Sequence, residues 1–118
     1  MIIILIYVKL VGSRVDVSSL YSAMDVFFLP SLFEGLPITS IEAQAAGLPC
    51  VISDSVTKEL VYSDLVCFVS LKSSLNEWND QIIKQSMRKI NRSKYLCDLK
   101  ESSFYTPRAD KLLSKYYL

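Results

Sequence analysis

Apolar runs and amphipathic segments alternate along the chain, and their order predicts the fold class. Short runs of consecutive apolar residues predict buried strands over residues 2–11, 25–30, 48–53 and 63–70. Segments with apolar residues at helical spacing predict helices over residues 16–24, 37–47, 74–91 and 106–118. Strands that alternate with helices are typical of βαβ units, so we predict an α/β fold with a parallel sheet and flanking helices.

Residues with known boundary preferences stand at the ends of these predicted helices. Asp16 or Ser18 is available to cap the first helix, and Gly47 is placed to end the second. Thr106 would cap the last helix, with Pro107 at its first position. Residues 93–103 are mostly polar and lack a clear period, so no element is predicted there.

Composition narrows the class of protein further. The 118 residues allow one domain with a modest core, and the net charge of +1 gives no indication of a nucleic-acid partner. The chain has no histidine, which removes the commonest general base and the commonest metal ligand, and we expect neither a metal nor a cofactor.

The cysteines and the apolar N-terminus both favour a cytoplasmic protein. Cys50, Cys67 and Cys97 lie far apart in the sequence without zinc-site spacing. Cys50 and Cys67 fall within apolar runs and are interpreted as buried, reduced core residues. The run over residues 1–8 is too short to span a bilayer and has no basic segment before it, so a strand is the better interpretation.

The predicted loop over residues 30–37 is the strongest candidate for a binding site. It joins a strand to a helix, and ligands of open parallel sheets bind at the carboxyl ends of strands. The N-terminus of the following helix would attract phosphate, and Gly35 would allow the backbone to approach a ligand. Glu34 and Glu42 flank this position, and carboxylates accept hydrogen bonds from sugar hydroxyls. A nucleotide sugar has the matching layout, with phosphates between two polyhydroxylated groups.

Each of these residues also has a purely structural interpretation. Thr39 and Glu42 match a capping box, in which the glutamate binds the helix backbone and no ligand. Glu34 alone is typical of a solvated loop acid, and Gly35 with Pro37 is ordinary turn chemistry. Spacing alone does not decide between the two interpretations.

The longer stretch "PSLFEGLPITSIEAQAAGLPCV", residues 30–51, resembles the EX7E motif region of the family 4 retaining glycosyltransferases. The matching residues are Pro30, Ser31, Glu34, Gly35, Pro37, Glu42, Ala43, Ala46, Gly47 and Pro49. The resemblance implies a Rossmann-like sheet that forms part of the C-terminal, donor-binding domain of a GT-B enzyme. Residues 1–105 would then be an incomplete nucleotide-sugar-binding domain, and residues 106–118 a C-terminal helix.

The resemblance also implies roles for individual residues. Glu34 would be catalytic and lie near the donor-sugar hydroxyls, and Glu42 would hold the ribose diol. The donor-binding backbone between them would comprise Gly35, Leu36, Pro37, Ile38 and Thr39. The segment 12–14 matches the backbone that meets the base only weakly, and Arg14 is better interpreted as an exposed surface charge. Such enzymes generally use no metal and stabilise the departing diphosphate electrostatically.

The intact enzyme implied by the resemblance would use a nucleotide-sugar donor and a saccharide or lipid-linked acceptor, in polysaccharide biosynthesis. It would be cytoplasmic, and a lipid-linked acceptor would make it membrane-peripheral. The chain resembles only the later part of the donor domain, so we expect an N-terminal truncation and little activity from the chain alone. We also expect self-association, or pairing with a separate chain that carries the N-terminal domain.

Two alternatives to this function stay open at this point, and a third is disfavoured. The chain could be a nucleotide-diphosphate-binding module without catalysis, or a remnant that binds nothing. A receiver-like signalling domain is disfavoured, because "KLVGSR" supplies no pair of acids after the first predicted strand.

Overall fold

The computed structural model describes residues 7–100 of the chain. In chain order its elements are α2 (Val17–Ala23), β1 (Phe27–Leu29), α3 (Ile38–Ala45), β2 (Cys50–Ser53), the 3-10 helix η1 (Lys58–Leu60), β3 (Val66–Val69), α4 (Leu75–Ser86) and α5 (Ser93–Lys100). The predicted helix over residues 106–118 lies outside the described residues, as does the predicted boundary at residue 105.

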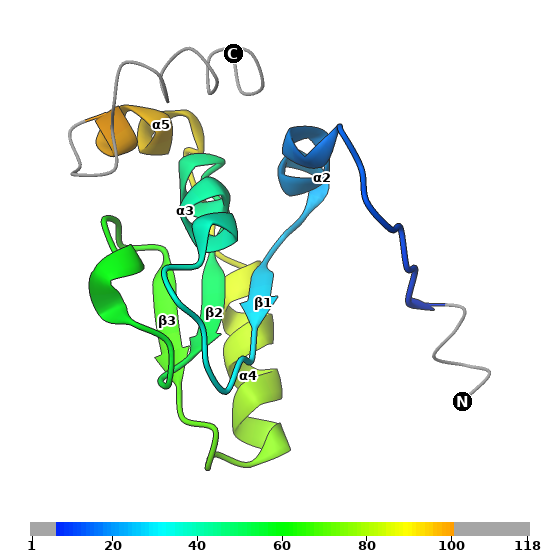
Figure 1. Ribbon diagram of the computed structural model, residues 1–118, viewed down its shortest axis with the longest axis vertical. Helices are drawn as coiled ribbons and strands as arrows, with labels where there is room; N and C mark the ends of the chain where they lie inside the picture. The colour runs from blue at the N-terminus through cyan, green and yellow to red at the C-terminus, as the bar shows by residue number, and fades with distance from the viewer. Residues whose placement is uncertain (1–6, 101–118) are drawn as a thin grey trace.

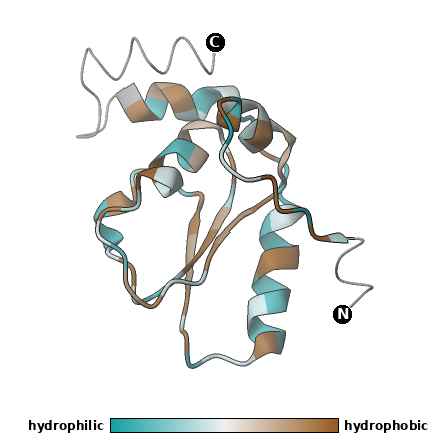
Figure 2. Cartoon of the chain, turned by 45° about the vertical axis from the view of Figure 1, so that its right-hand side comes forward, coloured by the Kyte–Doolittle hydropathy of each residue, from teal (hydrophilic) through white to brown (hydrophobic). Residues whose placement is uncertain are grey.

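The three strands form one parallel sheet in the order β1-β2-β3, with helices on both faces (Figure 1). Phe27 pairs with Cys50, and Cys50 pairs with Val66, so the strands are in step and their carboxyl ends share one edge. This confirms the predicted α/β class and the Rossmann-like parallel sheet with flanking helices. Figure 2 shows the apolar character of these strands.

Alternate residues of β2 supply two cores, one on each face of the sheet. Cys50 and Ile52 lie in the cluster that contains Ala43 of α3, while Val51 lies in the cluster that contains Trp78 of α4. All four residues of β2 are buried, because a central parallel strand is covered on both sides. Burial on both faces of the sheet therefore explains the continuous apolar pattern that predicted this strand.

The strand predicted over residues 2–11 is wrong for the part that the structure describes. Val8–Val11 form no strand, and the side chain of Leu10 is 97% exposed. A strand needs a hydrogen-bonded neighbour, and no described strand pairs with the outer edge of β1. Residues 2–6 lie outside the described residues.

The region after β3 differs from the prediction in two ways. Helix α4 ends at Ser86, five residues before the predicted end at Asn91. Helix α5 occupies a segment where no element was predicted, and its Leu96 and Leu99 form a cluster with Ala45 of α3. Tertiary packing on α3 thus stabilises a helix whose local sequence is a weak signal.

The cysteines follow the prediction in part. Cys50 is buried, and burial raises the pKa of its thiol to about 12, so the thiol stays protonated. Cys67 is only half-buried, and Cys97 is exposed. No helix within residues 7–100 has the length and apolar character needed to cross a membrane.

Candidate functional site

The loop from Pro30 to Pro37 lies at the carboxyl edge of the sheet and leads into α3 (Figure 1). The neighbouring strand β2 holds this loop in place, because the hydroxyl of buried Ser53 at the end of β2 donates to the carbonyl of Ser31. The Ser31 hydroxyl in turn donates to Oε1 of Glu34 at 2.9 Å. Glu34 is half-buried, so its carboxylate is held by the loop and still reaches solvent.

The N-terminus of α3 presents backbone N–H groups that no side chain caps. Pro37 is the N-cap residue and makes no side-chain hydrogen bond to the helix. Ile38 and Thr39, in the first turn, are exposed, with the Ile38 side chain 66% accessible. Ser40 is buried, and its hydroxyl donates to the carbonyl of Pro37 at 2.6 Å. An uncapped helix N-terminus at a strand's carboxyl end is suited to an anion such as phosphate.

Glu42, in the second turn of α3, contacts a residue from a different helix. Its Oε2 atom accepts a hydrogen bond from the Tyr21 hydroxyl of α2 at 3.4 Å. The same hydroxyl lies 3.4 Å from the carbonyl oxygen of Thr39. The capping box is therefore wrong: α3 begins at Ile38 after Pro37, so Thr39 is inside the helix and Glu42 does not cap it.

Burial gives Glu42 and Tyr21 unusual protonation properties. Desolvation raises the pKa of Glu42, and the hydrogen bond from Tyr21 partly offsets this shift. Desolvation, followed by the nearby Glu42 carboxylate, raises the pKa of Tyr21 to about 12. The phenol is therefore a hydrogen-bond donor throughout the physiological pH range.

The remaining predicted site residues lie between Glu34 and Glu42 in the sequence. Gly35 and Leu36 are exposed, and a Cβ atom built on Gly35 would meet no atom within 4 Å. Open space beside this backbone agrees with an approach by a ligand. Glu34 and Glu42 have separate partners, and no contact among the described residues joins the two carboxylates directly.

The segment 12–14 is not joined to this site. Arg14 forms an exposed ion pair with Asp16, with Nη2 and Oδ2 2.6 Å apart. The hydrogen bond from Arg14 lowers the pKa of the Asp16 carboxyl. Asp16 is the N-cap residue of α2 by position, but its side chain binds Arg14 and not the helix. The interpretation of Arg14 as a surface charge is confirmed.

Two residues of the site were not identified from the sequence. Ser31 is a matching residue of the motif, but its side-chain hydrogen bond to Glu34 was not predicted. Tyr21 gave no local signal, because its contact with Glu42 joins residues 21 positions apart.

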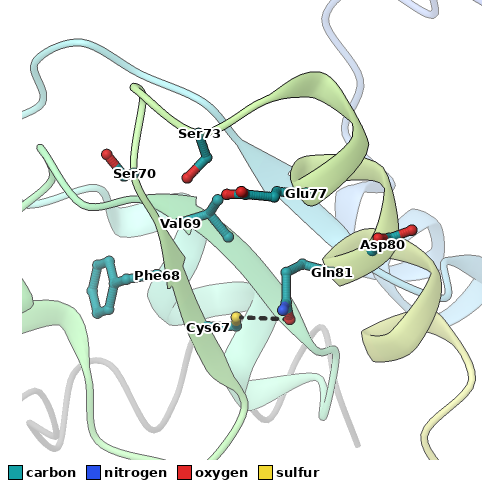
Figure 3. Close-up of a pocket in the computed structure, with 8 residues that line it drawn as sticks. All are labelled: Cys67, Phe68, Val69, Ser70, Ser73, Glu77, Asp80 and Gln81. Carbon is teal, nitrogen blue, oxygen red and sulfur yellow. Dashed lines mark hydrogen bonds between the residues drawn. The ribbon is translucent and has the colours of Figure 1, made fainter.

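A separate pocket of about 330 Å³ lies between β3 and α4 (Figure 3). Cys67, Ser70 and Ser73 line one side, and Glu77, Asp80 and Gln81 line the other. The Cys67 thiol lies 3.5 Å from Oε1 of Gln81. None of the predicted site residues contributes to this pocket. Within the described part of the chain, no group of three or more acidic or cysteine side chains is arranged to hold a metal ion.

Comparison with known protein families gives a match over most of the chain. The family model described as "Glycosyl transferases group 1" matches residues 5–85, a range that contains both glutamates and the loop between them.

Individual relatives are bacterial proteins that are much longer than the matched stretch. EpsF of Bacillus subtilis (strain 168), whose name describes a glycosyltransferase, is 41% identical over 78 residues, which are 65% of this chain and 20% of that protein. The Escherichia coli UDP-Gal:alpha-D-GlcNAc-diphosphoundecaprenol alpha-1,3-galactosyltransferase is 51% identical over 45 residues, 38% of this chain and 12% of that protein.

A third relative is the N,N'-diacetylbacillosaminyl-diphospho-undecaprenol alpha-1,3-N-acetylgalactosaminyltransferase of Campylobacter jejuni subsp. jejuni serotype O:2 (strain ATCC 700819 / NCTC 11168). It is 43% identical over 47 residues, 40% of this chain and 12% of that protein. The matched stretches therefore span a fifth or less of each of these relatives.

Proposed function

Because this chain belongs to the group 1 glycosyl transferases, we propose that it supplies the donor-binding part of a retaining, nucleotide-sugar-dependent glycosyltransferase. The observation that carries the proposal is the uncapped N-terminus of α3 at the carboxyl edge of a parallel sheet, flanked by Glu34 and Glu42. The helix end can bind a phosphate, and each of the two carboxylates can accept hydrogen bonds from hydroxyl groups.

In the proposed complex the donor diphosphate lies at the start of α3. The backbone N–H groups at Ile38 and Thr39 would donate to its oxygens, and the partial positive charge of the helix end would stabilise it. The same groups would stabilise the negative charge that grows on the diphosphate as its bond to the anomeric carbon breaks. Residues 35–37 would pack against the sugar and the diphosphate, which the open space beside Gly35 permits.

The two glutamates would hold opposite ends of the donor. Glu34, with Oε1 fixed by Ser31, would act close to the hydroxyls of the transferred sugar. Glu42, with Oε2 bound to Tyr21, would accept hydrogen bonds from the ribose diol through its other oxygen. Charged acceptors form shorter and stronger hydrogen bonds than neutral ones, which suits carboxylates to this task.

For the acceptor, the names of two relatives indicate the class of molecule. Both relatives are described as acting on a saccharide linked to diphosphoundecaprenol. By this likeness we propose that the protein takes part in polysaccharide or glycoconjugate assembly on a lipid-linked saccharide acceptor, on the cytoplasmic side of a membrane. We also propose that transfer needs more of the enzyme than the matched stretch, since this stretch spans a fifth or less of the relatives.

A nucleotide titration tests the donor site directly. UDP, GDP and ADP are added in turn to the isotope-labelled chain, and backbone NMR shifts are recorded beside those of a Glu42→Ala variant. We expect shifts at residues 34–42 for one nucleotide, with affinity reduced about tenfold in the variant. A folded chain that shows no shift with any of the three nucleotides would contradict the proposal.

A further inference from the structure

The Tyr21 side chain is held rigidly at the contact between α2 and α3. Its side chain is 4% exposed, and its ring packs edge-to-face on Phe27 of β1 with the centroids 6.3 Å apart. The ring belongs to the same core cluster as Ala43, Leu48 and Ile52. A tyrosine fixed in this way offers its hydroxyl from a defined position.

Arg92 fixes the helix that carries this tyrosine. Its guanidinium, from the segment between α4 and α5, donates to the carbonyls of Tyr21 and Ser22 at 3.2 Å each and to the carbonyl of Met24. These carbonyl groups lie at the C-terminal end of α2, where the backbone N–H of Met24 also donates to the carbonyl of Tyr21 at 3.3 Å. One side chain therefore ties α2 to the body of the fold at the residue that contacts Glu42.

The Tyr21 hydroxyl contacts only one of the two carboxylate oxygens of Glu42. The Tyr21 hydroxyl lies 3.4 Å from two acceptors, Oε2 of Glu42 and the carbonyl oxygen of Thr39, and Oε1 of Glu42 has no hydrogen-bond partner among the described residues. The titratable groups recorded around this contact are Tyr21 of α2, Glu42 of α3 and Cys50 of β2. Both Tyr21 and Cys50 are protonated at neutral pH, so Tyr21 acts only as a donor toward the carboxylate.

We propose that Tyr21 is a positioning residue for the ribose-binding carboxylate: its hydroxyl fixes Oε2 of Glu42 and so directs Oε1 toward a ribose diol. The inference rests on the proposed donor-binding function and adds a residue from α2 to it. Arg92 supports the arrangement by holding α2 in place.

The chain contains a matched control for this hydroxyl. Tyr95 of α5 is also 4% exposed and also donates to a carboxylate, Oδ1 of Asp64, at 2.7 Å. Tyr95→Phe therefore removes a hydrogen bond from a buried tyrosine to a carboxylate outside the proposed site. Tyr21→Phe keeps the ring and its contact with Phe27, so the variant is expected to fold.

The first measurement reads the contact without any ligand. The side-chain carboxyl carbon of Glu42 is titrated by NMR in the full chain and in both variants. Loss of the donor should raise the titration midpoint of Glu42 in Tyr21→Phe and leave it unchanged in Tyr95→Phe. An unchanged midpoint in Tyr21→Phe would overturn the proposed contact.

The second measurement separates positioning from packing. Affinities for UDP, GDP and ADP are compared with those for their 2′-deoxy forms, which lack one hydroxyl of the diol. In Tyr21→Phe we expect the affinity for the bound ribonucleotide to fall about threefold to tenfold, while the affinity for the deoxy form stays constant. Combination with Glu42→Ala should abolish this effect.

The outcomes distinguish the two proposals. Equal losses for the ribose and deoxy forms in Tyr21→Phe would assign a merely structural role to Tyr21 and overturn this inference alone. Failure of the unmodified chain to bind any of the nucleotides would overturn the donor-binding function itself. Arg92→Ala, which leaves both partners intact, is a second variant and should reduce the preference for ribose in the same way.

Discussion

Glu42 is a residue whose ionised form opposes the stability of the fold. Its carboxylate is half-buried, and its one described partner is the Tyr21 hydroxyl at the long distance of 3.4 Å. Burial accordingly raises the pKa of Glu42, which means that the folded protein holds its ionised form at a cost. Carboxyl groups with a shifted pKa are enriched at functional sites.

This cost leads to a pH-dependent prediction. The folded-state pKa of Glu42 is raised above its unfolded value of about 4.3, so the cost is absent below the unfolded value and complete above the folded one. Glu42→Gln should therefore raise the melting temperature near pH 7, and the gain should vanish as the pH falls to about 4. Thermal unfolding by circular dichroism at both pH values measures the difference.

The exposed Glu59 provides the control for this experiment. Glu59→Gln should alter the free energy of unfolding by no more than about 0.5 kcal/mol, as is usual for surface substitutions. A loss of stability in Glu42→Gln at pH 7 would instead show that the ionised carboxylate stabilises the fold, and would contradict this prediction.

At the scale of the elements, the C-terminal end of α3 depends on Gly47, which packs against Arg92, the residue that holds α2 in place. Gly47 has φ +72°, in the left-handed region, and a Cβ atom there would lie 2.6 Å from Cα of Arg92. The chain can turn after α3 because residue 47 adopts a left-handed φ and has no Cβ atom that would clash with Arg92. The placement of α3 thus depends on Gly47, a residue outside the predicted site.

We expect Gly47→Ala to cost more than about 2 kcal/mol in the free energy of unfolding, from backbone strain together with the backbone clash. Gly35→Ala is the matched control, because Gly35 has no left-handed φ and a Cβ there would meet nothing within 4 Å. Its stability should change by less than about 0.5 kcal/mol, whereas its nucleotide affinity should fall if the loop approaches the diphosphate. Chemical denaturation and the NMR titration measure the two effects separately.

Element signals in the sequence were reliable where the cause was local. The buried run of β2 and the glycine that ends α3 both produced correct predictions, because each follows from backbone and burial rules within a few residues. Helix α5 was not predicted, since it depends on Leu96 and Leu99 packing against α3. The same limit applies to the site: Glu34 and Glu42 were identified by their motif, but the partner of Glu42 comes from a helix distant in sequence.

At the scale of the whole molecule, the segment before α2 and the loop after β1 both expose large apolar side chains. Tyr7, Leu10 and Val15 before α2 are 81%, 97% and 95% exposed. Leu32 and Phe33 in the loop after β1 are 82% and 86% exposed. The outer edge of β1 also has no partner strand within residues 7–100 (Figure 1). Exposed apolar side chains beside an open sheet edge favour association.

We therefore expect the chain to self-associate, with a sedimentation coefficient that rises with concentration and rises further in sulfate, which strengthens apolar burial. The double variant Leu10→Ser and Val15→Ser should reduce this association, because it removes two of the most exposed apolar side chains of the segment before α2. Leu75→Ser, at a residue of α4 that is 86% exposed, is the control and should have a smaller effect. A monomer at every concentration would show instead that this surface does not drive association. Nucleotide binding could then be measured on a single species, and the affinities of the Tyr21 and Glu42 variants could be compared without correction for assembly.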